Sequence, residues 1–471
     1  MVMRLILWLL GLIVLSACTA VPELSKGAAG GAAAPIAIVG VTVIPMTEES
    51  ALLPNYTVVI RDGKIAAVGP RGKLAIPAGA VIIDGTGRFL MPGLTDAHVH
   101  LEYIENPDIL KLFVANGVTT IRSMDGRPFI LGWRERTSSG DLIGPRIITA
   151  GPIIDGSPPA RDDNLAAADA TASRAAVAAQ KQQGYDFIKA YSNLSSETYD
   201  ELIREAELRG LKVAGHIPRA VPLDRAIAAQ WSIEHLGDFA AVVTAEDESP
   251  VPGWARRSLA APLSSSRLQA LARQLATAGV WVVPTSVQQD RSLAPDIELK
   301  AWLVDPQMRN IPSFALEQWK GATSWWQRLD AGDWALVGQA RKNRLMMISE
   351  FREAGVRMAI GSDTPNPFVI PGASVHLELA NFVAAGFSPA ESLAAATIEP
   401  ARMLDLDQVQ GSVEAGKRAD LLLLYANPLD DIANAAARVG IFLSGRWFSE
   451  QELQSMAQDL ARATPTTQRV Q

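Results

Sequence analysis

The chain has 471 residues, of which 48% are hydrophobic and 20% are charged, so it can bury a large core and is neither disordered nor fibrous. Its formal net charge is −7 and it contains no block of basic residues, which makes a nucleic-acid partner unlikely on electrostatic grounds. A single cysteine excludes an intramolecular disulfide and a zinc site built on cysteines.

Residues 1–17 have the proportions of a secretory signal peptide. Arg4 is their one positive side chain, and the apolar run after it is too short to span a bilayer as a mature helix. Small residues then precede Cys18, in an order that resembles the lipobox of bacterial lipoproteins. We predict a lipidated Cys18, a flexible tether over residues 18–35, and an exported protein that is anchored to a membrane and faces the periplasm. An ordinary secretory signal with an incidental cysteine is the alternative.

Short β-branched runs separated by turns occupy residues 36–90. Asp62-Gly63, between two of these runs, is a hairpin signal. Strand-like patterning returns near the C-terminus, so residues 36–90 and 407–450 together predict a small composite β-sandwich domain, followed by a helix and tail over residues 451–471. The expected strands lie at residues 36–43, 57–61, 64–68, 81–84, 411–425 and 441–447.

Residues 91–406 alternate short apolar segments with Ala-rich helical stretches, which is typical of repeated β–α units around a parallel sheet. With the segment that ends at His98, eight candidate strands can be counted, the number that a TIM (β/α)8 barrel requires. The predicted fold class is therefore α/β, with a TIM barrel flanked by the composite domain. The other seven candidate strands lie at residues 118–122, 146–150, 187–191, 212–216, 232–235, 280–284 and 358–363.

Two stretches, residues 237–266 and 287–344, are longer than a minimal barrel needs. The second contains five of the 11 tryptophans. These residues could form a lid or a substrate wall, or they could pack as an inserted helical layer or an oligomer contact.

Four of the five histidines fall at the ends of predicted barrel strands. His98 and His100 lie two residues apart, so both imidazoles can face one ion from the same side of a strand. His216 and His235 end two later apolar segments, and Asp363 ends another. Because the catalytic groups of TIM barrels sit at the C-terminal ends of the strands, this placement predicts a metal site.

Lys189 ends the fourth predicted strand, between the two histidine pairs. A divalent cation would repel an ammonium at this position. Addition of carbon dioxide to the amine would give a carbamate, an anion whose two oxygens can bridge two metal ions. The alternative is a lysine whose side chain extends away from the barrel mouth.

Residues 87–100, which read GRFLMPGLTDAHVH, resemble the signature of the amidohydrolase superfamily. Similar motifs follow at residues 117–122, 233–235, 361–363 and 416–421. Within the superfamily, residues 36–447 resemble the imidazolonepropionase-like and prolidase-like branch. The resemblance implies a TIM barrel and metal-dependent hydrolysis. By position it implies one metal on His98 and His100, a second on His216 and His235, a bridge by carboxylated Lys189, and Asp363 completing the first site.

The expected cofactors are two divalent metal ions, with zinc favoured by the ligand set although manganese, cobalt or iron would also fit. Two ions can share a hydroxide and polarise a substrate carbonyl. Asp363 is expected to take the proton of the attacking hydroxide and pass it to the leaving amine. Tyr191 either donates to the developing oxyanion or packs against its neighbours.

Three further side chains are candidates for substrate binding. Arg122 and Arg219 could pair with a substrate carboxylate, as a dipeptidase would need, although Arg122 belongs to a family motif and could be structural. His376 lies just beyond the eighth strand, where substrate-contacting loops gather; helix capping or packing is the alternative.

The leading hypothesis is a hydrolase with a binuclear centre that cleaves the amide bond of small molecules, either dipeptides of the Xaa-Pro type or N-acyl amino acids. A mononuclear hydrolase of cyclic amides or a deaminase is one alternative. A lactonase or phosphotriesterase-like enzyme would use the same metal ligands. The alternative that is not an enzyme is a tethered binding protein without catalytic activity. Substrate specificity in this architecture depends on the loops after the strands, so the sequence predicts neither the identity of the substrate nor the oligomeric state.

Overall fold

The computed structural model describes residues 34–47, 52–244, 259–291, 296–323 and 329–461. The predicted signal peptide, Cys18 and nearly all of the tether lie outside these ranges and stay predictions. Within the described ranges, each helix is too short or too polar to cross a bilayer.

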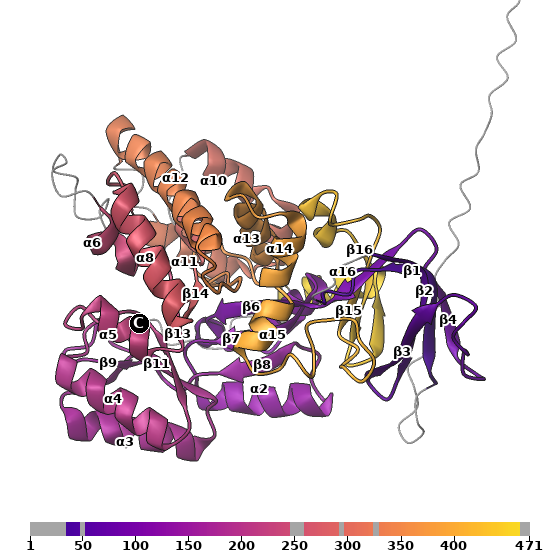
Figure 1. Cartoon of the computed structure of the whole chain (residues 1–471), viewed down its shortest axis with the longest axis horizontal. Coiled ribbons are helices and arrows are strands. Elements are labelled where there is room, and N and C mark those ends of the chain that lie inside the picture. Colours follow the sequence, from indigo (N-terminus) through magenta and orange to yellow (C-terminus); the bar gives the residue numbers. More distant parts are fainter. Residues whose placement is uncertain (1–33, 48–51, 245–258, 292–295, 324–328, 462–471) are drawn as a thin grey trace, which may run out of the picture.

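Strands from both ends of the chain form one eight-stranded sheet, at the right of Figure 1. The order is β17-β16-β15-β5-β1-β2-β3, with β4 paired to β1. The predicted hairpin at Asp62-Gly63 is confirmed between β2 and β3. Both predicted segments thus contribute to one sheet, whereas its division into two facing layers stays a prediction. The strands are β1 (Ile36–Val43), β2 (Leu53–Arg61), β3 (Lys64–Pro70), β4 (Val81–Asp84), β5 (Phe89–Pro92), β15 (Leu421–Leu424), β16 (Arg438–Leu443) and β17 (Arg446–Ser449).

The expected strand over residues 411–425 is confirmed only at its end, in β15. Gly411 and Gly416 have φ angles of 92° and 93°, which lie in the left-handed region and not in the extended region of a strand. The apolar run that forms β15 begins only after these turns.

Nine strands of the middle of the chain form two parallel sheets, in the orders β6-β7-β8 and β10-β9-β11-β12-β13-β14. Isolated parallel bridges join Ala150 to Phe187, Val282 to Met358 and Val99 to Thr364. These bridges connect the two sheets with each other and with residues 358–364, which gives a TIM-barrel-like arrangement. The strands are β6 (Leu94–Val99), β7 (Val118–Ser123), β8 (Arg146–Thr149), β9 (Ile154–Asp155), β10 (Leu165–Ala166), β11 (Phe187–Ala190), β12 (Lys212–Gly215), β13 (Ser232–Glu234) and β14 (Trp281–Val283).

The predicted regular strand over residues 358–363 is wrong. Asp363 has a φ angle of 60°, which a strand does not contain. The Ser362 amide donates to a side chain, the Asp96 carboxylate, at 2.8 Å. The segment still runs beside β6, because the Ala97 amide donates to the Ile360 carbonyl at 2.9 Å. The irregular backbone is what turns Asp363 toward the histidines.

Helices pack around the parallel strands (Figure 1). Several begin at side-chain caps, as at Asp169, which accepts from the Ala172 amide, and at Ser388, which forms a capping box with Glu391. The helices are α1 (Ile109–Ala115), α2 (Pro128–Ser139), α3 (Ala170–Gln183), α4 (Ser196–Leu208), α5 (Leu223–Ala229), α6 (Ala240–Val243), α8 (Ser265–Ala278), α9 (Ser286–Arg291), α10 (Asp296–Leu303), α11 (Ser313–Thr323), α12 (Ala331–Glu353), α13 (Ala373–Ala384), α14 (Pro389–Ala395), α15 (Ile398–Met403) and α16 (Glu450–Ala461).

The Trp-rich stretch forms α9 to α12. Trp319 is buried, and the rings of Trp302 and Trp319 lie 6.0 and 5.8 Å from the ring of Phe368. These contacts favour the packing interpretation over a free lid for the two tryptophans. Trp325 and Trp326 lie outside the described residues.

Candidate metal centre

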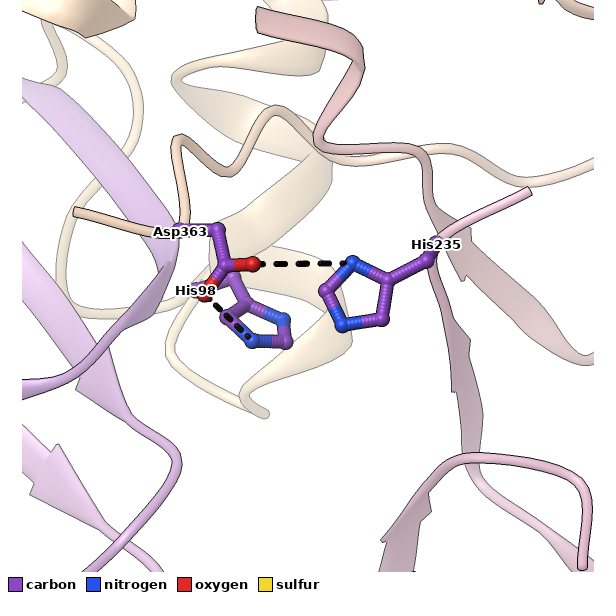
Figure 2. A group of neighbouring side chains, drawn as sticks. All are labelled: His98, His235 and Asp363. Carbon is purple, nitrogen blue, oxygen red and sulfur yellow. Dashed lines mark ion pairs between the residues drawn. The ribbon is translucent and has the colours of Figure 1, made fainter. Parts of the chain in front are cut away.

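Asp363 is the meeting point of three predicted ligands, two of which, His98 and His235, are drawn with it in Figure 2. His98 lies on β6, and its Nε2 is 3.4 Å from Asp363 Oδ1. His100, one residue beyond β6, places its Nε2 at 3.2 Å from the same oxygen. His235 follows β13, and its Nδ1 is 3.8 Å from Asp363 Oδ2. One potential ligand atom each from His98, His235 and Asp363 lie within 4.8 Å of one another, a spacing that a metal ion can occupy.

His216 extends this cluster. It follows β12, and its ring centroid is 4.9 Å from that of His235. The His235 ring is in turn 4.7 Å from the His98 ring. The structure therefore brings all four predicted histidines and Asp363 into one continuous group at the C-terminal ends of the strands.

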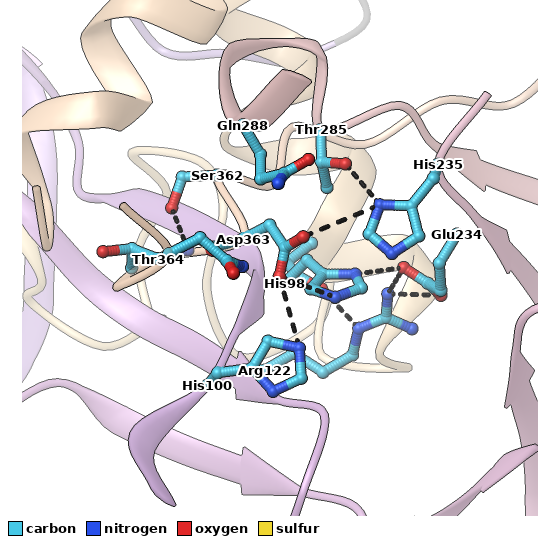
Figure 3. A network of polar contacts seen from close by, with 12 residues as sticks. His98, His100, Arg122, Glu234, His235, Thr285, Gln288, Ser362, Asp363 and Thr364 are labelled. Carbon is cyan, nitrogen blue, oxygen red and sulfur yellow. Dashed lines mark hydrogen bonds and ion pairs between the residues drawn. The ribbon is translucent and has the colours of Figure 1, made fainter. Parts of the chain in front are cut away.

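A carboxylate lies at the Nδ1 atom of three of the histidines; Figure 3 labels one of these pairs, His98 with Glu234, and also the pair of His235 with Thr285. The pairs are His98 with Glu234 at 2.7 Å, His100 with Glu102 at 2.6 Å and His216 with Asp238 at 3.4 Å. His235 Nδ1 meets the hydroxyl of Thr285 at 2.6 Å. A carboxylate that accepts from Nδ1 keeps the proton on that atom and leaves the lone pair of Nε2 for a metal. None of these four partners was predicted from the sequence.

Arg122 acts on this cluster through Glu234. Its Nη2 donates to both Glu234 oxygens at 2.8 Å, its Nη1 donates to Ser232 and its Nε to the Ala97 carbonyl. Burial alone would raise the pKa of Glu234, but Arg122 and His98 hold it well below its ordinary value. The Arg122 side chain is 0% exposed, which favours the structural alternative over the predicted contact with a substrate carboxylate. Arg122 instead positions the carboxylate that orients His98.

Lys189 lies on β11, with 1% of the residue exposed. Its Nζ is buried and has no hydrogen-bond partner among the described residues. Burial lowers the pKa of Lys189 to about 8, and its charge lowers the pKa of both His98 and His235. The lowered pKa enlarges the neutral fraction of the amine, which is the form that adds carbon dioxide. The residues therefore fit a carbamate.

Asp363 is held ionised. Burial alone would raise its pKa, but His98, His100 and His235 hold it below its ordinary value. Its amide donates to the His98 carbonyl at 2.8 Å, which fixes the backbone beside β6.

The structure separates the remaining predicted site residues. Tyr191 follows β11, and its ring centroid lies 4.4 Å from that of His216, so it belongs to the cluster. Arg219 lies in the loop after β12, where its Nη1 donates to Asn193 and no described contact joins it to the predicted ligands.

His376 is not part of the cluster. Its Nε2 donates at 2.9 Å to the carbonyl of Asn116, which precedes β7 at the opposite end of the strand from the histidines. This contact favours the packing alternative over the predicted substrate contact, because α13 places His376 against the end of α1.

Two residues near the cluster were missed. The ring of Tyr103 stacks on His100 with centroids 5.3 Å apart and an interplanar angle of 18°. Arg161 lies over the Tyr103 ring at 5.2 Å, and its Nη1 donates to the Tyr103 hydroxyl. The closeness of Tyr103 to His100 in the chain was a weak signal; Arg161 lies in a loop that gave none.

A large cavity lies away from this site. It has a volume of about 910 Å³ and is lined by Arg134 of α2, Arg146 at the start of β8 and Phe448 of β17. Arg146 marks the N-terminal end of a barrel strand and Phe448 belongs to the eight-stranded sheet, so this cavity lies away from the C-terminal strand ends that carry the histidines.

Residues 89–448 match the family model described as Amidohydrolase family. The chain belongs to the amidohydrolase family. An imidazolonepropionase from Symbiobacterium thermophilum is 24% identical over 411 residues, which are 80% of this chain and 85% of that protein. An adenine deaminase from Paracoccus denitrificans is 35% identical over 72 residues, but these are only 15% of this chain and 12% of the deaminase.

Two solved structures share the fold of this amidohydrolase. A bottromycin amidohydrolase superposes with a TM-score of 0.70 and 24% identity, covering 90% of this chain and 88% of the other. A Xaa-Pro dipeptidase with methionine bound in its active site superposes with a TM-score of 0.63 and 20% identity, covering 88% of this chain and 100% of the other. The predicted family is confirmed, and the protein is a hydrolase of carbon–nitrogen bonds in which His98, His235 and Asp363 bring three potential metal ligands within 4.8 Å of one another.

Proposed function

We propose that this amidohydrolase is an amidase with two divalent metal ions, with zinc favoured, bridged by carboxylated Lys189. The observation that carries the proposal is the Nζ atom of Lys189, which is buried without a hydrogen-bond partner among the described residues. An unpaired buried amine destabilises a fold. A carbamate between two cations would remove that penalty, because its oxygens would be bound on both sides.

The histidines and Asp363 supply the other ligands. His98, His100 and Asp363 would hold one ion, and His216 and His235 the other. Imidazole and carboxylate donors of this kind suit zinc. When bound, the ions would polarise the substrate carbonyl and lower the pKa of a water molecule.

Asp363 and Tyr191 would do the proton chemistry. The Asp363 carboxylate is ionised and would accept a proton from the attacking water, then pass it to the leaving amine. The Tyr191 hydroxyl, beside His216, would donate to the oxygen that becomes negative in the transition state.

The proposed substrates are dipeptides of the Xaa-Pro type or N-acyl amino acids. The Xaa-Pro dipeptidase among the structural neighbours supports this class. Hydrolysis of a cyclic amide at one metal is a second candidate, since His98, His235 and Asp363 by themselves bring three ligand atoms within 4.8 Å of one another, enough for a single ion. We also propose that the protein is exported and tethered to a membrane through lipidated Cys18.

A hydrolysis assay tests the proposal. Wild type, Lys189→Ala and a matched control, Lys181→Ala in the exposed surface of α3, would be supplied with zinc and bicarbonate and offered dipeptides, N-acyl amino acids and, separately, cyclic amides. We expect wild type and Lys181→Ala to cleave dipeptides or N-acyl amino acids and Lys189→Ala to be inactive on them. Equal activity of Lys189→Ala and wild type would overturn the carbamate, and cleavage of cyclic amides alone would favour the second candidate.

A further inference from the structure

We propose that Arg161 and Tyr103 form an anion-binding subsite beside the metal centre, and that this subsite selects substrates carrying a carboxylate near the scissile amide. The inference rests on the proposed function and deepens it, because it names the residue that recognises the charge of the substrate.

The subsite is continuous with the predicted ligands. Tyr103 ends the 3-10 turn η1 (Leu101–Tyr103), which follows β6 and His100. Its ring lies nearly parallel to the His100 ring, with the centroids 5.3 Å apart. The Arg161 guanidinium lies over the same phenol ring at 5.2 Å. One aromatic side chain therefore separates the guanidinium from His100.

The guanidinium is both held in place and accessible. Nη1 donates to the Tyr103 hydroxyl and Nε meets Asp163 at 3.3 Å, while Nη2 has no partner among the described residues. The side chain is 39% exposed. A cation that is fixed before the ligand arrives loses little conformational entropy on binding, and the planar guanidinium matches the geometry of a carboxylate.

The other two arginines considered for this role lack one of these properties. Arg122 is fully buried and donates to Glu234, Ser232 and the Ala97 carbonyl. Arg219 is accessible, but its described side-chain contact is with Asn193 and not with the aromatic rings around the histidines. Arg161 alone among the three combines exposure with a direct packing path to the cluster.

An equilibrium test separates this proposal from the proposed function. The probes are two thioether analogues of a substrate, in which –CH2–S– replaces the scissile amide and which end in a carboxylate or in a primary alcohol. Neither can be hydrolysed as an amide. Their dissociation constants would be measured by calorimetry on the metal-loaded full chain for wild type, Arg161→Gln, Tyr103→Phe, Arg219→Gln and Arg134→Gln.

We expect wild type to bind the carboxylate about 10- to 100-fold more tightly than the alcohol, the preference given by a charge-assisted hydrogen bond. Arg161→Gln should bring that ratio close to one, and Tyr103→Phe should reduce it in part because the guanidinium loses its hydroxyl partner. Arg134→Gln, which changes an arginine that pairs with Asp186 far from the centre, should keep the wild-type ratio. Melting temperatures check that each variant folds.

A preference that survives in Arg161→Gln would overturn the proposal, because the metal ions or another residue would then recognise the carboxylate. Loss of the preference in Arg219→Gln with its retention in Arg161→Gln would assign the role to Arg219 instead. Failure of the proposed function has a different signature: no amide is hydrolysed by wild type, whatever the ratio of the two dissociation constants.

Discussion

Replacement of Arg122 by methionine tests whether the buried ion pair beneath the centre organises it. Arg122 and Glu234 are both 0% exposed, and Nη2 of the arginine lies 2.8 Å from the carboxylate. Removal of one partner of a buried pair costs about 3–5 kcal/mol, because the other charge stays in the interior without compensation. We therefore expect Arg122→Met to lower the free energy of unfolding at pH 7 by about that amount.

The effect has a defined pH dependence. In wild type the pKa of Glu234 is lowered by Arg122 and His98, so the stability that the pair contributes is present above the ordinary value of 4.5 and is lost as the pH falls below it. In Arg122→Met, burial would dominate and the pKa of Glu234 would rise. The difference in stability between the two proteins should therefore be largest near neutral pH and shrink toward pH 4.

Urea unfolding followed by tryptophan fluorescence at both pH values measures this difference. Addition of Glu234→Gln to Arg122→Met removes the stranded charge and should recover part of the stability. It should not recover metal affinity, because His98 then lacks its charged partner. A loss below about 1 kcal/mol for Arg122→Met, or unchanged metal affinity in the double variant, would refute the reasoning.

Three further predictions concern the centre. Burial lowers the pKa of His100, but Glu102 and Asp363 raise it to about 10 in the metal-free protein. Metal binding at pH 7 should therefore release a proton, and the metal affinity should increase with rising pH. Calorimetry in buffers of different ionisation enthalpy measures the proton release, and a binding heat that does not depend on the buffer would contradict it. Asp238→Asn should weaken metal binding about 10- to 100-fold in competition with a chelator, because His216 loses its charged partner; equal affinity would show that Asp238 does not orient it. Tyr191→Phe should lower kcat about 100-fold with little change in KM if its hydroxyl stabilises the transition state, whereas unchanged kcat would leave packing as its role.

Much of the fold could be predicted because local patterns dictate it. β1 has the predicted bounds Ile36–Val43, since its apolar and β-branched residues recur until the next turn. The positions of the four histidines could be predicted because each ends a short apolar run, and parallel strands bring their C-terminal ends together.

The contacts that complete the centre could not be predicted in this way. His98 meets Glu234, which lies 136 residues along the chain, and the sequence gives no signal for such a pairing. Arg122 belongs to a recognisable motif, but only the packing of β7 against neighbouring strands shows that its side chain points into the barrel and away from solvent. Arg161 lies in a loop whose path depends on the whole barrel.

The central claim is a centre of two metal ions bridged by a carbamate on Lys189. Its most direct test is the metal content per chain of the purified protein, wild type beside Lys189→Ala, with bicarbonate supplied during expression and purification. The account predicts about two ions per chain in wild type and one or none in Lys189→Ala. One ion in both proteins would contradict it.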